Sequence, residues 1–281
     1  MYPLQQSITA LEYFSALVHC DEGFPLFEVA ACLAHDEHPE LNLFEMMNEV
    51  DHLIRRLELQ IPKTVEPLRK VQILNRFFYR ECGFAPNLNH YHDSENSYLS
   101  CVIRNRRGHA ISLALIWMEL AQAIGVRAAL VCFNKEILIK VYLPDGQAML
   151  EPNTGFSYSR PELDALMGMG NGIKAEDVKR REMMFAFYSS DLMPRIIVEK
   201  LALQLCQTFE MTQDWAKVLL VMNRMVVLLP DKIDYYRERG WVYTRLGDAS
   251  RAEQDFEIFL AESEEGPEHE AVLKCLQDLR S

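Results

Sequence analysis

The sequence predicts an α+β protein in which a buried helix is followed by three antiparallel strands, with helical regions before and after them in the chain. Residues 111–125, ISLALIWMELAQAIG, are almost wholly apolar, and a helix that is apolar nearly all round is a buried helix. Two β-rich runs follow, at residues 126–134 and 136–144. The Asp145-Gly146 pair after them is a strong hairpin signal, so residues 148–152 are predicted to form the third strand.

Helical spacing of apolar residues marks the chain on both sides of this core. Before the core, it predicts helices at residues 7–20, with Ser7 as the cap, and at residues 26–38, 42–59 and 65–82. Residues 84–97 are polar and predict a loop, and residues 97–108 a short helix. Glycines 168, 170 and 172 mark residues 160–182 as a linker or lid. We therefore divide the chain into a helical N-terminal region of the core domain (1–82), the core (83–165), a linker (166–182) and a helical C-terminal region (183–281).

Composition excludes several classes of function. The chain has 281 residues and a net charge of -12, so it repels nucleic acid on average, and no direct DNA binding is expected. Its seven cysteines are widely spaced and include no Cys-x-x-Cys pair, which predicts reduced thiols in a cytoplasmic protein. No run of 18 apolar residues is present, so no membrane partner is expected. Nothing in the sequence calls for a cofactor.

Residues 228–263 resemble a tetratricopeptide helix pair. Small and aromatic residues stand where that repeat packs its two helices together: Gly240, Tyr243, Gly247, Ala252 and Phe256. A single repeat cannot bury its apolar face alone, so we expect this pair to dock on a neighbouring part of the chain. Repeats of this kind present grooves for peptides or helices, which predicts a protein partner.

The stretch from residue 91 to 126, YHDSENSYLSCVIRNRRGHAISLALIWMELAQAIGV, resembles the SirB family of bacterial transglutaminase-like proteins with a tetratricopeptide-like C-terminal part. The residues that carry the resemblance are Asp93, Asn96, Ser97, Leu99, Arg107, Gly108, Ser112, Leu113 and Gly125. The resemblance implies a papain/transglutaminase-like core. It also implies a link to the regulation of virulence or invasion genes.

Transglutaminase-like enzymes share a catalytic set of Cys, His and Asp. The resemblance of this chain to them places these three positions on Ala110, Glu136 and Glu151. A cysteine at a helix start is useful because the helix N-terminus stabilises its thiolate. Alanine offers no nucleophile, and a carboxylate near pKa 4 is a weak base at pH 7. We therefore expect a degenerate, non-enzymatic core that acts through protein–protein interaction. We also expect the three residues to converge at one cleft, with Ala110 facing Glu136.

A rival interpretation keeps an enzyme. Ser112 is a candidate replacement nucleophile and His109 a candidate displaced base, which would make a residual hydrolase or acyl-transferase with an altered site. The simpler interpretation makes Ser112 the N-cap of the buried helix and His109 a loop residue. Glu136 and Glu151 are also candidates for a carboxylate pair acting on a sugar, although strand-end glutamates are more often solvated or paired with arginine.

Two polar clusters remain. His90, His92 and Asp93 have the composition of a metal site, but histidines two apart point the same way only on a strand, and this segment is predicted as a loop. We therefore predict no metal. The second cluster, Arg104, Arg106 and Arg107, is basic within an acidic chain. It is a candidate site for an acidic partner or a phosphate, or for an internal salt bridge to one of the two strand-end glutamates.

Overall fold

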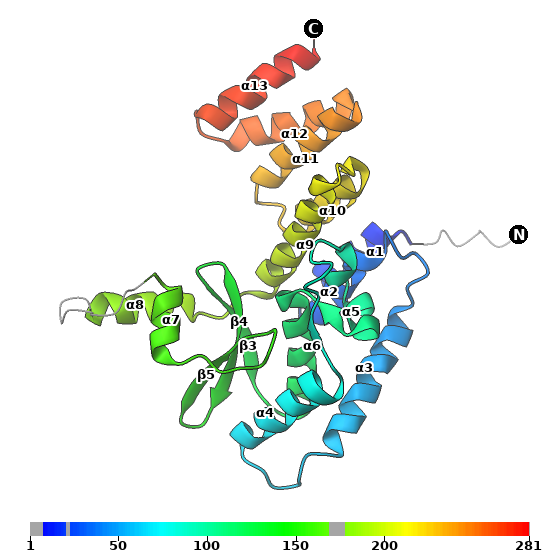
Figure 1. The fold of residues 1–281 in the computed structure, drawn as a ribbon. Coiled ribbons are helices and arrows are strands. Elements are labelled where there is room, and N and C mark those ends of the chain that lie inside the picture. The colour runs from blue at the N-terminus through cyan, green and yellow to red at the C-terminus, as the bar shows by residue number, and fades with distance from the viewer. Residues whose placement is uncertain (1–7, 21–22, 169–177, 281) are drawn as a thin grey trace, which may run out of the picture. The chain divides into compact units, whose positions relative to one another are not determined.

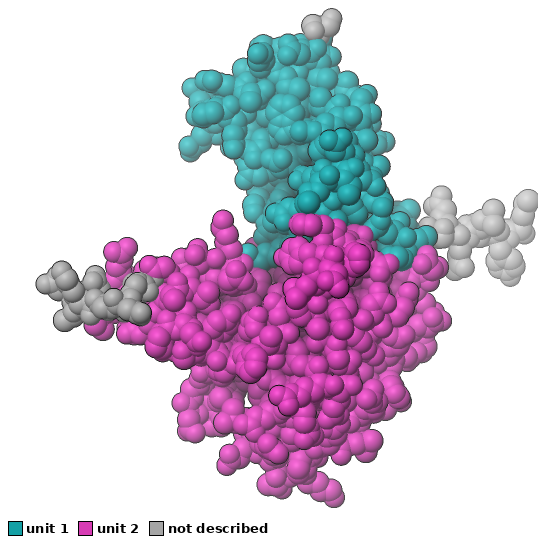
Figure 2. Space-filling view, viewed as in Figure 1, with its two compact units in different colours: residues 1–39, 198–281 teal, residues 40–197 magenta. Residues whose placement is uncertain are grey.

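The computed structural model describes residues 8–20, 23–168 and 178–280, and its contacts divide the chain into two compact units. Unit 1 combines residues 1–39 with residues 198–281, and unit 2 is formed by residues 40–197 (Figure 2). The sequence-based division placed its boundaries at residues 82, 165 and 182 instead. The difference arises because the first helices of the chain pack with the last ones. Within the described residues, no helix has both the length and the apolar character needed to cross a bilayer.

Unit 2 is built around one buried helix, α6 (Ala110–Ala123). Several of its side chains are completely buried, among them Leu113, Ile116 and Trp117. Three helices pack around it: α3 (Leu43–Glu58), α4 (Pro67–Asn75) and α5 (Leu99–Asn105). The short elements between them are η2 (Arg76–Glu81), β1 (Ala85–Pro86), η3 (Ser94–Asn96) and β2 (Arg107–Gly108). The predicted buried helix is therefore confirmed.

The sheet of unit 2 has three antiparallel strands in the order β3 (Ala128–Phe133), β4 (Glu136–Leu143) and β5 (Gly146–Leu150). These are the strands that the sequence predicted. Helix α6 packs against β3 and β4. The other face carries Val131, Leu138 and Met149, which form one apolar cluster with residues of α7 (Arg160–Leu166) and α8 (Val178–Tyr188). The sheet thus lies between α6 on one side and α7 and α8 on the other (Figure 1).

Helices α7 and α8 lie at the two ends of residues 160–182, the segment predicted as a linker or lid. Helix α7 begins at a capping box, in which Ser159 accepts from the backbone of Glu162 while the Glu162 carboxylate accepts from the Ser159 backbone N–H. An ion pair between Asp164 and Arg181 joins α7 to α8. Gly168 follows α7 with a positive φ of 76°, while the other two glycines of the predicted linker lie outside the described residues.

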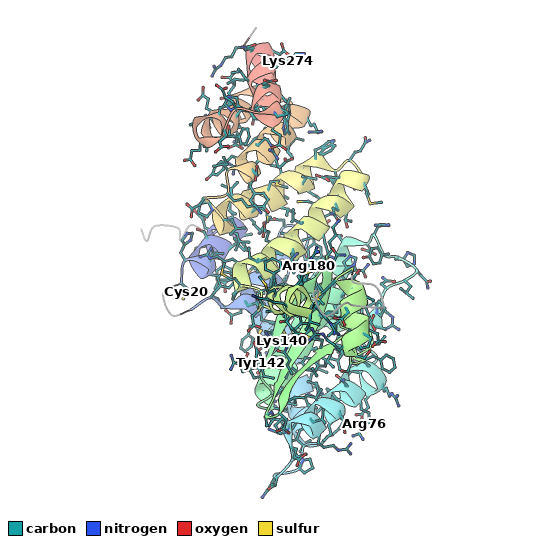
Figure 3. All side chains as sticks on the ribbon, turned by 90° about the vertical axis from the view of Figure 1, so that its left-hand side faces the viewer. Cys20, Arg76, Lys140, Tyr142, Arg180 and Lys274 are labelled. Atoms are coloured by element: carbon teal, nitrogen blue, oxygen red, sulfur yellow. The ribbon has the colours of Figure 1, made fainter. Side chains whose placement is uncertain are left out.

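The chain after α8 is held to the sheet by a buried lysine. Lys140 of β4 forms an ion pair with Asp191, and its ammonium group donates to the carbonyl of Ser189 at 2.7 Å. Tyr142, the next residue on the same face of β4, donates its hydroxyl to Asp191 at 2.5 Å, and the two strand residues are labelled in Figure 3. These bonds explain how the buried ammonium group of Lys140 is accommodated, because a carboxylate and a carbonyl oxygen accept from it.

Unit 1 consists of helices, listed here in chain order: α1 (Ala10–Val18), α2 (Leu26–Ala31), η1 (Cys32–Ala34), most of α9 (Pro194–Met211), α10 (Trp215–Leu228), α11 (Asp234–Leu246), α12 (Ala249–Glu262) and α13 (Pro267–Leu279). Thr9 caps α1 through a capping box with Glu12, and the predicted cap Ser7 lies outside the described residues. Helix α1 packs on α10, where the buried Arg224 forms an ion pair with Asp36. This pairing explains why the first 39 residues belong with the C-terminal helices.

The C-terminal helices pack as the repeat pattern predicted. Tyr243, Ala252 and Phe256 lie in one buried cluster with residues of α12 and α13. Gly240 lets α11 approach α12 closely, because a Cβ atom there would lie 2.5 Å from the ring of Phe256. Gly247 ends α11 in the left-handed conformation, with a φ of 77°.

We predict that Trp117→Ala destabilises the protein by about 3–5 kcal/mol. The ring of Trp117 is completely buried, and its indole N–H donates to the side-chain oxygen of Asn75 at 2.9 Å, so the substitution leaves both a cavity and an unpaired acceptor. Urea unfolding followed by far-UV circular dichroism measures the loss. Leu59→Ala is the control, since Leu59 is 88% exposed and its loss should change stability by less than about 0.5 kcal/mol.

A second prediction concerns Gly240→Ala. Alanine favours helix by about 1 kcal/mol over glycine, yet the added methyl group would overlap the Phe256 ring. We expect the overlap to dominate and to lower stability by about 1–3 kcal/mol. Gly266→Ala, at the N-cap of α13, is the control for adding a methyl group without overlap, because no atom lies within 4 Å of a Cβ atom placed there. A Gly240→Ala variant that is more stable than the wild type would show that α11 and α12 separate at no cost.

Candidate functional site

The start of α6 is fixed by the two residues before it. Gly108 belongs to β2, where it pairs with Pro86 of β1, and a Cβ atom on it would lie 2.7 Å from the methyl groups of Val102. His109 is the N-cap residue, and its backbone N–H donates to the carbonyl of Asn96 at 2.9 Å. Ala110 is therefore the first residue of the helix, the position at which the resemblance expects a cysteine, and it is half-buried.

The preceding loop is held to this helix start by Asn96. The buried amide of Asn96 donates to the carbonyl of His90 at 2.6 Å and accepts from the side chain of Asn87 at 3.0 Å. Asp93 caps the short helix η3 by accepting from the backbone of Glu95. In the described part of the chain, the ligand atoms of His90, His92 and Asp93 do not gather closely enough to share one metal ion.

His109 is buried at the helix start and packs edge-on against the ring of Tyr91, with 4.9 Å between the ring centres. Burial is the main cause that lowers the pKa of His109 to about 4, and nearby His92 lowers it further, while Asp93 acts in the opposite direction. The imidazole is therefore neutral at pH 7 and is a weak base. Sequence reasoning did not single out Tyr91, since an aromatic residue in a polar loop carries no local signal for its contact.

Ser112 is completely buried and is the third residue of α6. Its hydroxyl donates to the carbonyl of Ser97 at 3.3 Å. The prediction that Ser112 is the N-cap is therefore wrong by one helical turn, because the chain enters the helix at His109 after β2. The serine instead joins the first turn of α6 to the residues before α5.

The register of the sheet decides which way Glu136 points. Glu136 pairs with Phe133 across the turn formed by Asn134 and Lys135. Side chains alternate along a strand, so Glu136 lies on the same face as Leu138, which is the face covered by α7 and α8. Helix α6 packs on the opposite face. The alignment expected Ala110 to face Glu136, and the strand register instead directs Glu136 toward the α7 side.

Glu151 follows β5 at the same end of the sheet, because β4 and β5 are antiparallel. Its carboxylate accepts from the side chains of Asn153 and Thr154 in the turn that it begins. Burial raises the pKa of Tyr158, and Glu151 and then Glu136 raise it further. Both glutamates thus lie within electrostatic range of Tyr158, a residue that sequence reasoning had not singled out.

The three arginines have different surroundings. Arg106 adopts a left-handed conformation with a φ of 58°, and its guanidinium lies 4.7 Å from the centre of the Phe84 ring. Arg107 donates to the carbonyls of Gly83 and Arg106 at 2.7 and 2.8 Å. Arg104 is exposed near the end of α5. Arg106 and Arg107 therefore stabilise the loop beside β2.

Two family profiles match this chain. The profile of the transglutaminase-like superfamily matches residues 44–197, which are more than half of the chain. The chain belongs to the transglutaminase-like superfamily. A tetratricopeptide repeat profile matches residues 207–277. The predicted fold class, a transglutaminase-like core with a tetratricopeptide-like helical region, is confirmed.

Relatives occur in several bacteria under one name. A UPF0162 protein of Xylella fastidiosa (strain Temecula1) is 29% identical over 85% of this chain and 84% of its own length. The UPF0162 protein PM0557 of Pasteurella multocida is 24% identical over 92% of this chain and 94% of its own. The UPF0162 protein YchA of Escherichia coli K12 is 22% identical over 81% of this chain and 82% of its own. The relatives thus match along both units.

We predict that His109 makes the protein acid-sensitive. Its pKa is about 4 in the folded chain and about 6.5 when unfolded, so the unfolded state takes up a proton first as the pH falls. The contribution of neutral His109 to the free energy of unfolding is complete above pH 6.5. It falls by about 3 kcal/mol between pH 6.5 and 4. Urea unfolding of wild type and His109→Gln at several pH values measures it. Parallel pH profiles for the two proteins would mean that His109 titrates normally.

Proposed function

We propose that this chain acts by binding other proteins and that its transglutaminase-like core has no thiol chemistry. The observation that carries the proposal is Ala110 in the first turn of α6. By the resemblance, this is the position at which transglutaminase-like enzymes have their cysteine. A methyl group at this position cannot attack a carbonyl carbon. In this proposal the core is a scaffold, and the start of α6 packs against neighbouring residues instead of carrying a reactive group.

The side chains around Ala110 support this proposal. Ser112 donates its hydroxyl to a backbone carbonyl, and a serine nucleophile needs a base to accept that proton. The low pKa of His109 makes it a poor base at pH 7. Burial raises the pKa of the Cys101 thiol in α5, which disfavours its nucleophilic thiolate. None of these three residues offers the combination that acyl transfer requires.

The helical C-terminal region supports a binding role. Tetratricopeptide-like helices stack into surfaces that hold peptides or helices, and the match to residues 207–277 covers α10 to α12 in full. We further propose a cytoplasmic location and, from the SirB resemblance, a role in regulating virulence or invasion genes. Because the chain carries a net charge of -12, such regulation would act through a protein partner rather than through direct contact with DNA.

The rival interpretation, an enzyme with Ser112 as its nucleophile, predicts labelling by a serine-directed probe. If Ser112 were a nucleophile, a fluorophosphonate probe would label the wild-type protein and would not label Ser112→Ala. We expect no such labelling, because Ser112 is completely buried. Thiol-directed probes need a Cys20→Ser background, since Cys20 is exposed and will react without any catalytic role. Serine labelling that disappears in Ser112→Ala would overturn the proposal.

The binding role itself is tested by pull-down from native bacterial lysate with the full chain as bait. We expect at least one partner to be retained reproducibly. Arg104→Glu reverses the charge of the exposed arginine, and Arg80→Glu, also exposed, is the matched control. Loss of a partner in Arg104→Glu but not in Arg80→Glu would assign Arg104 to the interface. A folded Arg104→Glu variant that keeps every partner would exclude it.

A further inference from the structure

Helices α9, α10 and α11 of unit 1 enclose a pocket of about 480 Å³. In Figure 1 these helices run from yellow to orange. The pocket is lined by the rings of Trp215 and Trp241, by Met222, and by the charged side chains of Glu210, Glu238 and Arg245. Aromatic faces beside carboxylates form an environment that suits a cationic group with an apolar stem.

The two carboxylates of the pocket come from different helices and repel each other. Burial raises the pKa of Glu210, and Glu238 of α11 raises it further, while Arg245 acts in the opposite direction. Glu238 forms an ion pair with Arg237 at 2.8 Å. Among the described residues, no lysine or arginine forms an ion pair with Glu210. A cation entering the pocket would therefore lower the repulsion between Glu210 and Glu238, which Arg237 and Arg245 offset only in part.

The chain already shows how a guanidinium sits on this surface. The guanidinium of Arg245 lies 4.5 Å from the centre of the Trp215 ring, and it donates to the carbonyl of Trp241 at 3.2 Å. One face of the aromatic wall is thus stacked with a planar cation. The Arg245 side chain is itself exposed, so it leaves the pocket open to solvent.

The charge of the two units favours the same kind of ligand. Unit 1 contains 22 aspartates and glutamates against 10 lysines and arginines, whereas unit 2 contains 19 of each. The whole net charge of -12 therefore belongs to unit 1. A strongly acidic surface attracts basic partners at long range and repels acidic ones.

We propose that this pocket binds a lysine or arginine side chain presented by a basic segment of a partner protein. The cation would pair with Glu210 and Glu238, and its aliphatic stem would lie along Trp241 and Met222. This inference rests on the proposed binding function and adds to it the site and the chemistry of the partner.

The tryptophans make a direct test possible, because the chain has three of them, each with one indole N–H signal in a ¹⁵N-correlated NMR spectrum. Trp117 is buried in unit 2 and serves as the internal reference. The full chain is titrated with N-acetyl-arginine amide, N-acetyl-lysine amide and a short arginine-containing peptide. The matched neutral probe is N-acetyl-citrulline amide, which keeps the shape of arginine without its charge.

We expect saturable shifts of the Trp215 and Trp241 signals with the cationic probes, no shift of Trp117, and no saturation with citrulline. Glu210→Gln should weaken the binding of the arginine peptide about tenfold, since it removes a charge-assisted contact. Glu264→Gln is the control, because it removes one exposed charge of unit 1 away from the pocket. Equal shifts with citrulline, or no shift at all, would each overturn the inference.

The pull-down separates this inference from the binding function. A double variant, Glu210→Gln with Glu238→Gln, should lose partners that the wild-type chain retains. If the double variant keeps every partner, the pocket is not the site, while the binding function stands. If the wild-type chain retains no partner at all, the binding function fails whatever the NMR titration shows.

Discussion

The structure of unit 2 depends on burying most of the surface of α6. A helix with no polar face cannot lie at a surface, so α3, α4 and α5 pack on part of it and the sheet packs on the rest. Full burial of a large apolar side chain contributes about 1.5–3 kcal/mol. Both ends of the helix are also held. β2 precedes its first turn, and the ammonium group of Lys70 donates to the carbonyl of Ile124 at 2.7 Å.

This burial also determines what chemistry the helix start can support. The free N–H groups and the dipole of a helix N-terminus favour a negative charge such as a thiolate and disfavour an imidazolium. Ala110 places an uncharged methyl group there, and His109 is kept neutral by burial. The hydroxyl of Ser112 donates a hydrogen bond to the backbone carbonyl of Ser97. The same packing that makes α6 the centre of the unit thus keeps His109 neutral and Ser112 hydrogen-bonded at the start of the helix.

Local patterns predicted α6, the strands and the repeat helices, because apolar spacing and turn residues act over a few positions. The face on which Glu136 lies could not be found this way. It depends on a two-residue turn in which Asn134 and Lys135 have φ values of 45° and 81°, and a shift of one residue would reverse the face. Lysine gives no signal for such a turn. The ion pair of Asp36 with Arg224 joins residues 188 apart, so no local pattern announces it.

The separation of charge between the two units limits where electrostatic recognition can begin. Screening confines the field of exposed charges to about 8 Å at physiological salt, so a partner responds to the unit that it approaches. The equal numbers of acidic and basic residues in unit 2 give it no net attraction for either sign. Two of its clustered arginines, Arg106 and Arg107, are also occupied by a ring and by backbone carbonyls. The proposed basic partner would therefore be attracted by unit 1 before it contacts the pocket of Glu210 and Trp241.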